Sequence, residues 1–292
     1  MPTFATPEPI AVTLEIGVGD VRIVAGERAD TVVEVRPTDA TKKSDVSLAE
    51  ETRVDYVNGV LTIKAPKGRR QYRIWGGAES IDVEVEVPTG SHIGGVTGVA
   101  SVRASGPLGD VRVKTGVGDI QLEQAGQVEL KTGAGRIAIG RASGNASITT
   151  GSGTVEIGSL GGGGVVKNSN GDTWIGEATS DLRVRAANGK IVVERALGTV
   201  AAKSANGDIR LGEVSGGAIS AETACGRIEI GVLAGVSAWL DLDTHFGDVR
   251  NGLDTTGPPQ PGEKTVEVRA RTAFGDVSVS RKVGSPTGIG AA

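Results

Sequence analysis

The sequence has few aromatic, sulfur-containing or imidazole side chains. Aromatic residues make up 3% of its 292 residues, and it contains one cysteine, one methionine and two histidines. The single cysteine, Cys225, excludes an internal disulfide and a cysteine-based metal cluster. No apolar run is long enough for a transmembrane helix, and the N-terminus lacks the basic start and apolar stretch of a signal peptide. We therefore expect a soluble cytoplasmic protein without a membrane span.

Charge is also modest. The net charge is −4 and 23% of the residues are charged, so no strong field attracts nucleic acid, and we expect no specific nucleic-acid partner. Glycine, in contrast, is abundant, with 46 residues. Many glycines and few rings suit a narrow core of stacked aliphatic side chains better than a deep globular core.

One short motif is repeated through the middle of the chain. Lys114–Leu122 has the sequence KTGVGDIQL, and Lys131–Ile139 has KTGAGRIAI. The motif contains one glycine that recurs every 17 to 19 residues. These fixed glycines are Gly118, Gly135, Gly153, Gly171, Gly189, Gly207 and Gly226. Such a period is typical of stacked repeat architectures.

Each repeat holds two short segments in which aliphatic and polar residues alternate, as in half-buried strands. A meander of hairpins and a β-solenoid are both compatible with this pattern, and the residue after each fixed glycine distinguishes them. That column is Asp119, Arg136, Thr154, Asp172, Lys190, Asp208, Arg227 and Asp248. From Asp172 to Asp248 the sign alternates at every step, which favours a salt ladder between stacked coils about 4.8 Å apart. We predict an all-β, right-handed parallel β-solenoid (β-helix) with about 18-residue coils.

A second column supports the stack. Asn170, Asn188 and Asn206 precede three consecutive fixed glycines, and Cys225 occupies the same position in the next coil. Asparagine tolerates the left-handed backbone of turns, and stacked asparagines can also form an amide ladder. We therefore expect corner residues here, with Cys225 at a corner as well.

The sequence predicts three regions. Residues 1–90 form a β-rich N-terminal cap, residues 91–283 the solenoid, and residues 284–292 a disordered tail. Within the cap, Ala11–Val24 contains one copy of the motif, Pro37–Glu50 is expected to be an exposed loop, and Asn58-Gly59 marks a hairpin. Asn251–Gly262 is expected to project as a loop.

The chain resembles the Toastrack family of adhesin-like β-strand-repeat domains. The resemblance rests on the opening GVGDV motif at residues 17–21, the hairpin ending in Leu61-Thr62-Ile63, the strand Val83–Pro88 and the recurring TGxGDI copies. It implies a binding module without catalytic residues; family members are often membrane-anchored and linked to bacterial envelope-stress systems.

Catalytic chemistry has little support. The two histidines, His92 and His245, have no nucleophile or orienting partner that the pattern would place beside them. We expect both at the surface, and we expect neither a metal nor a cofactor. The alternative function is a carbohydrate-active β-helix enzyme acting on a polysaccharide, which would require converging carboxylates.

Basic residues form an outward-facing column four residues before the fixed glycines, which we call the basic stripe. It consists of Lys114, Lys131, Lys167, Arg185 and Lys203, with Thr149 at one coil. Such a column is compatible with a solvated strand face, whose long stems cover apolar surface. It also predicts a site for a polyanionic or acidic protein partner.

Three aromatic residues complete the predicted binding set. Trp174 lies on the outward side of its strand beside Val192, while Tyr72 and Trp75 lie in a polar stretch of the cap. Exposed aromatics mark protein or sugar contacts, although the cap could instead fold over Trp174.

Self-association is the last expectation. A solenoid leaves an unpaired edge at each end, and the C-terminal coil Thr272–Ser280 has no cap of its own. The strand Asp276–Ser280 is short and barely charged, and Arg281 and Lys282 follow it as gatekeepers. These features predict a homo-oligomer built through the C-terminal coil or a lateral face.

Overall fold

The computed structural model describes residues 1–66, 79–254 and 262–283. The chain divides into two compact units, Met1–Gly161 and Gly162–Ala292. Both are built from parallel strands in register, which confirms the β-solenoid predicted from the repeat. No helix of the described residues has the length and apolar character needed to cross a membrane.

Unit 1 contains five stacked coils. Their strands are β2 (Ala11–Gly26), β7 (His92–Pro107), β8 (Val111–Val117), β9 (Ile120–Ala125), β10 (Val128–Ala134), β11 (Ile137–Ala142), β12 (Ala146–Ser152) and β13 (Val155–Leu160). In β2 and β7 one continuous strand makes a whole coil, whereas each later coil has two strands. The motif copy in Ala11–Val24 is thus a coil, and β2 pairs along its length with β7.

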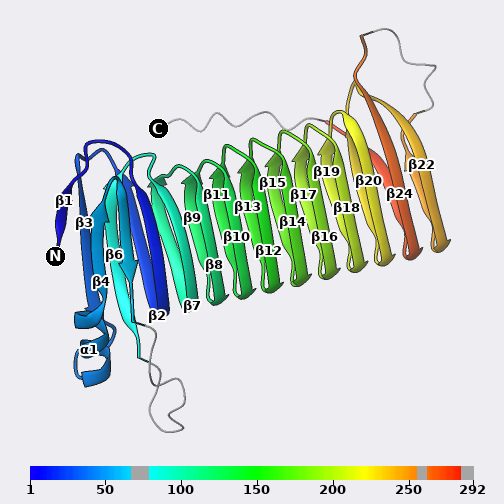
Figure 1. The fold of residues 1–292 in the computed structure, drawn as a ribbon. Coiled ribbons are helices and arrows are strands. Elements are labelled where there is room, and N and C mark those ends of the chain that lie inside the picture. Colours follow the sequence, from blue (N-terminus) through cyan, green and yellow to red (C-terminus); the bar gives the residue numbers. More distant parts are fainter. Residues whose placement is uncertain (67–78, 255–261, 284–292) are drawn as a thin grey trace. The chain divides into compact units, whose positions relative to one another are not determined.

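The remaining elements of unit 1 cover β2 on its other side. They are β1 (Thr3–Ala5), β3 (Asp30–Pro37), α1 (Lys43–Glu51), β4 (Arg53–Val57), β5 (Val60–Lys64) and β6 (Ile81–Pro88). β5 and β6 pair with β2, and β3 and β4 add antiparallel strands. The predicted hairpin is confirmed, with Asn58 and Gly59 at φ of 50° and 78°. Figure 1 shows these elements at the N-terminal end of the unit.

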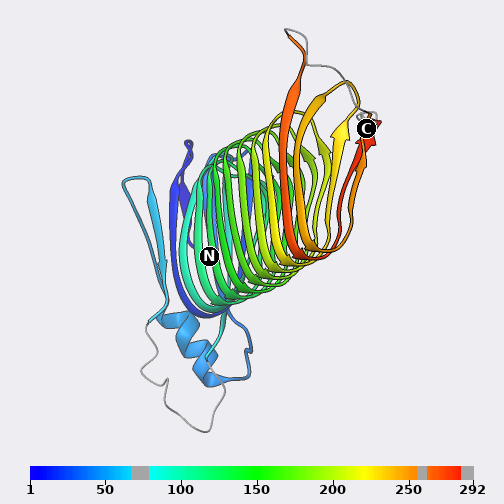
Figure 2. The same ribbon diagram turned by 90° about the vertical axis from the view of Figure 1, so that its right-hand side faces the viewer.

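The prediction of an exposed loop over Pro37–Glu50 is wrong, because α1 begins at Lys43. Its sequence is polar, but Leu48 is buried and Asp45 pairs with Lys42 at 2.9 Å. One buried leucine gives too weak an apolar pattern to reveal the helix. Figure 2 shows the helix lying outside the coils of this unit.

Unit 2 contains six coils of two strands each. They are β14 (Gly164–Asn170) with β15 (Thr173–Ala178), β16 (Leu182–Asn188) with β17 (Ile191–Ala196), β18 (Val200–Asn206) with β19 (Ile209–Val214), β20 (Gly217–Cys225) with β21 (Ile228–Leu233), β22 (Ser237–Phe246) with β23 (Val249–Gly252), and β24 (Thr265–Phe274) with β25 (Val277–Lys282). Asn251 and Gly252, expected in a loop, thus belong to β23. Most of that predicted loop and the predicted tail lie outside the described residues.

The last two coils of unit 2 are stacked out of sequence order. β24 pairs with β20 on one side and with β22 on the other, and β25 likewise lies between β21 and β23. Figure 1 shows β24 between β20 and β22. The coil Thr272–Ser280 is therefore internal, and the prediction that it forms the open C-terminal edge is wrong. That edge belongs to β22 and β23.

The fixed glycines lie at the corner between the two strands of a coil, with φ between +128° and +150°. A Cβ atom at Gly207 would lie 2.0 Å from the carbonyl oxygen of Gly189 in the neighbouring coil. Stacking at the spacing of hydrogen-bonded strands thus leaves no room for a side chain. A side chain in the core also stabilises this corner: the hydroxyl of buried Thr223 donates a hydrogen bond to the Gly207 carbonyl at 3.0 Å.

The charged column after the fixed glycines works differently from the predicted salt ladder. Asp172 accepts a hydrogen bond from the backbone N–H of Lys190 at 2.8 Å, and Asp208 accepts one from Arg227 at the same distance. No ion pair joins these side chains in the described part of the unit. The order of the column also differs from the sequence order. Arg227 is followed in the stack by Asp276 and only then by Asp248, because the last two coils are exchanged.

Candidate functional site

The outward face of the first strand of each coil carries the basic stripe. In unit 1, Lys114 and Lys131 are paired residues of β8 and β10, and Thr149 follows on β12. In unit 2, Lys167, Arg185 and Lys203 lie side by side on β14, β16 and β18. All five basic side chains are exposed. Strand alternation causes this, since the residues on either side of each cation point into the core.

Acidic neighbours balance part of the stripe. Lys203 pairs with Glu222 of β20 at 2.8 Å. Lys114 lies 3.9 Å from Glu129, which also binds Arg112 at 2.7 Å. Among the described residues, neither Lys167 nor Arg185 has an acidic side chain within 4.0 Å. The uncompensated charge of the stripe in unit 2 is therefore concentrated on β14 and β16.

Arg183 adds a further cation to this area. It precedes Arg185 by two residues on the same outward face of β16, between Val165 and Ala201 of the adjacent strands. We call Lys167, Arg183, Arg185 and Lys203 the basic cluster. Arg183 was not predicted as part of the site, because the residues at the equivalent position of the adjacent coils, Val165 and Ala201, are apolar and form no basic column with it.

The predicted aromatic residues do not join the basic cluster. Trp174 belongs to β15, on the second strand of its coil, opposite Val192 of β17 as expected. Its side chain is 40% exposed, and its indole Nε1 donates to Glu194 at 3.4 Å. Tyr72 and Trp75 lie outside the described residues. The proposal that the cap covers Trp174 is therefore left as a prediction.

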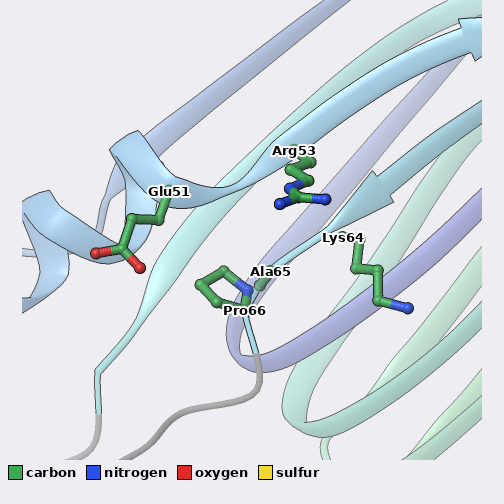
Figure 3. A pocket seen from close by; sticks show the side chains of 5 residues that line it. All are labelled: Glu51, Arg53, Lys64, Ala65 and Pro66. Atoms are coloured by element: carbon green, nitrogen blue, oxygen red, sulfur yellow. The ribbon is translucent and has the colours of Figure 1, made fainter.

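A hollow with a volume of about 340 Å³ lies on the N-terminal elements of unit 1. Its lining residues are Glu51, Arg53, Lys64, Ala65 and Pro66 (Figure 3). Lys64 is directly opposite Arg53 on the hairpin and pairs with Glu15 at 2.8 Å. Glycoside hydrolysis uses two carboxyl groups about 5 to 10 Å apart. Among the described residues the lining supplies one, so this part of the hollow gives no support to the polysaccharide-cleaving alternative.

The histidines and the cysteine occupy surface positions. His92 accepts a hydrogen bond from the backbone N–H of Asp110 at 2.9 Å, which gives it a structural partner at a corner. His245 and Cys225 are exposed, and Cys225 is in register with Asn206 as predicted. Within residues 1–66, 79–254 and 262–283, no three His, Cys, Asp or Glu side chains are grouped so that they could hold a metal.

The corner column that contains Cys225 changes character along unit 2. Asn188 donates to Asn170 at 2.8 Å and Asn206 donates to Asn188 at 3.0 Å, which confirms the amide ladder. Beyond Cys225 the same column continues with two phenylalanines, Phe274 and then Phe246. Their rings stack with centroids 5.0 Å apart. The aromatic surface at the C-terminal end was not identified from the sequence, although both residues occupy asparagine positions of the repeat.

A family model and several solved structures are similar to this chain. The family model described as Toastrack DUF4097 matches residues 11–283. A putative adhesin from Parabacteroides merdae ATCC 43184 is 13% identical, with a TM-score of 0.40 over 95% of this chain and 94% of that chain. A putative lipid binding protein from Parabacteroides distasonis ATCC 8503 is 12% identical, with a TM-score of 0.40 over 96% and 95%. A putative adhesin from Bacteroides fragilis NCTC 9343 is 14% identical, with a TM-score of 0.34 over 95% of each chain. The search of curated proteins found no match.

Proposed function

Because the chain belongs to the Toastrack family, we propose that it is a non-enzymatic, adhesin-like binding module whose basic cluster binds a linear polyanion. The observation that carries the proposal is the uncompensated charge of Lys167 and Arg185 on adjacent parallel strands. Like charges directly opposite each other on a sheet are destabilising. A bound anion would remove that cost, so the repulsion built into the face becomes a source of binding free energy.

The arrangement favours a linear ligand over a compact one. Three cations of the basic cluster follow the stacking direction, with neighbouring strands about 4.8 Å apart. A polymer that carries one anionic group per residue can meet several of them at once, and each contact releases counterions. An acidic protein surface presents the same charge less regularly and is the competing outcome of the experiment.

The test compares two double variants with equal charge change. Lys167→Glu with Arg185→Glu alters the basic cluster, whereas Lys190→Glu with Arg210→Glu alters two exposed cations away from it. Binding of sulfated oligosaccharides is measured by titration calorimetry at two salt concentrations. We expect the first variant to bind at least about tenfold more weakly and to show a smaller salt dependence, because phosphate- or sulfate-type contacts are lost.

Equal losses in the two variants would show attraction by net charge alone, and would contradict a defined site. An absence of binding by the unaltered protein would leave the stripe as a solvated strand face. Stronger binding of an acidic protein than of the oligosaccharide would assign the cluster to a protein partner. Release of reducing ends from any polysaccharide would contradict the non-enzymatic assignment.

A further inference from the structure

The exchanged order of the last two coils places β22 at an edge of unit 2. β24 is hydrogen-bonded to a strand on each side, with its Ala270 opposite Ala221 of β20 and Leu242 of β22. Among the described residues, β22 pairs with β24 alone. Its other side therefore presents backbone N–H and C=O groups of a ten-residue strand that no described strand satisfies.

The side chains at this edge are unusually apolar for a free strand. Leu240 and Leu242 point into the core but are only half-buried, whereas Val268 and Ala270, their counterparts on β24, are fully buried. Trp239 and Phe246 are 57% and 68% exposed. An added strand would cover the two leucines and continue the core by one more layer, as in recognition by strand addition.

Charge specifies which strand would fit. Asp241 is directly opposite Arg269 of β24, and Asp243 is directly opposite Arg271. Arg271 also reaches Asp241 at 3.2 Å, while Asp243 has no basic partner within the described part of the chain. The two outward columns thus change from arginine to aspartate at the last strand. A following strand with cations at both positions would face opposite charge in each column.

A second copy of β22 does not meet this requirement. In a parallel in-register pair, Asp241 would lie opposite the Asp241 of the other copy, and Asp243 opposite the other Asp243. The two antiparallel registers with the greatest overlap that keep the leucines inward place Asp241 opposite either Asp241 or Asp243. Each of these arrangements sets like charges against each other on a sheet edge, which opposes self-pairing.

We propose that β22 is a docking edge for an extended segment of a partner protein in which arginine or lysine alternates with aliphatic residues. The segment pairs with the free backbone of β22, places aliphatic side chains over Leu240 and Leu242, and places cations opposite Asp241 and Asp243. This surface lies on a different part of unit 2 from the basic cluster and selects the opposite charge. It is therefore independent of the proposed polyanion site.

The chain itself supplies a probe. A labelled peptide with the sequence of Thr265–Phe274 has the required alternation, because Arg269 and Arg271 alternate with aliphatic residues. In the fold this strand pairs with the occupied side of β22, where the two arginines lie opposite Asp241 and Asp243. Its binding to the full chain is measured by fluorescence anisotropy. We expect a peptide in which both arginines are replaced by glutamate to bind at least tenfold more weakly. Methylation of the amide nitrogens that would face β22 should abolish binding, whereas methylation of the alternate set should change it less than twofold.

Matched variants of the protein, in place of the peptide, test the same contacts. Asp243→Lys should weaken the arginine peptide at least tenfold and favour the glutamate peptide, whereas Glu8→Lys, an equal change at an exposed carboxylate of unit 1, should have no effect. Equal binding of the two peptides, or equal sensitivity to both methylation patterns, would overturn the proposal. A concentration-dependent dimer of the unaltered protein that Leu242→Lys abolishes would overturn it in favour of a second copy.

Discussion

Asp172 and Lys190 occupy equivalent corner positions of neighbouring coils, and they are joined through the backbone and not through their opposite charges. The carboxylate of Asp172 accepts a hydrogen bond from the N–H of Lys190 at 2.8 Å. Asp119 binds the N–H of Arg136 in the same way, also at 2.8 Å. A short carboxylate thus satisfies a corner amide of the next coil, while the cationic side chains are directed elsewhere: Lys190 is exposed, and Arg136 pairs with Glu156.

This geometry predicts unequal effects of removing the two side chains. Asp172→Ala should destabilise the fold by about 1 kcal/mol, because a corner amide loses its acceptor. Lys190→Ala should change the free energy of unfolding by less than about 0.5 kcal/mol. Urea denaturation of both variants at low and high salt checks the prediction. If both variants were equally destabilised and the effect disappeared in high salt, an ion pair between the two side chains would explain the column better than the backbone hydrogen bond.

The fixed glycines give a larger expected effect. Gly207→Ala combines a φ of +150° with a Cβ position 2.0 Å from the Gly189 carbonyl oxygen. We expect destabilisation of about 2 to 4 kcal/mol. Gly216→Ala is the control in the same unit, because its nearest neighbour, the Leu197 carbonyl oxygen, lies at 3.8 Å. Thermal unfolding of both variants should separate them clearly, and similar melting temperatures would contradict the close-stacking explanation.

The sequence predicts the coils well because the period expresses local geometry. A corner that needs a positive φ and has no room for Cβ requires glycine, so the seven fixed glycines locate the coils from β8–β9 to β20–β21. The coil of β7 is an exception, because Ala100 occupies the corner position opposite Gly19 of β2. The order in which coils stack is not local. β22 and β24 share one frame and can each pair in register with a neighbour, so their sequences do not reveal which lies outside.

The candidate site was predicted only in part for the same reason. Lys167, Arg185 and Lys203 follow from the frame, because equivalent positions of successive coils become neighbours. Whether each cation is balanced depends on side-chain reach, as the contact between Lys203 and Glu222 shows. Trp239 and Phe246 lie at the edge of the stack only because the last two coils are exchanged. This order cannot be inferred by comparing equivalent positions of the repeat.

Buried threonines inside the corner provide a matched pair of tests. The hydroxyl of Thr223 donates to the carbonyl of Gly207 at 3.0 Å, whereas the hydroxyl of Thr150, also buried, has no hydrogen-bond partner within the described residues. Thr223→Val should cost about 1 kcal/mol, because it leaves a carbonyl without its donor. Thr150→Val should be neutral or stabilising, because it removes an unsatisfied polar group. Denaturation in urea compares the two, and a larger loss at Thr150 would contradict this account.

Acid should weaken the N-terminal elements through Asp30. The Nε of Arg28 donates to the Asp30 carboxylate at 2.8 Å, and this hydrogen bond lowers the pKa of Asp30 below its ordinary value. A carboxyl group with a lowered pKa in the folded state stabilises the fold above its unfolded pKa, which is about 3.9. That stabilisation is lost as the pH falls through the lower folded value.

Arg28→Gln removes the donor and should therefore reduce stability at pH 7 more than at pH 3, where the carboxyl group of the unfolded chain is largely protonated. Arg28 also contacts Glu86, so Asp30→Asn isolates the contribution of Asp30 and should show the same direction of pH dependence. The measurement is the free energy of unfolding of each variant relative to the unaltered protein between pH 3 and pH 7. A difference that stays constant over this range, or grows toward low pH, would rule out the Arg28–Asp30 contact as the acid-sensitive element of the fold.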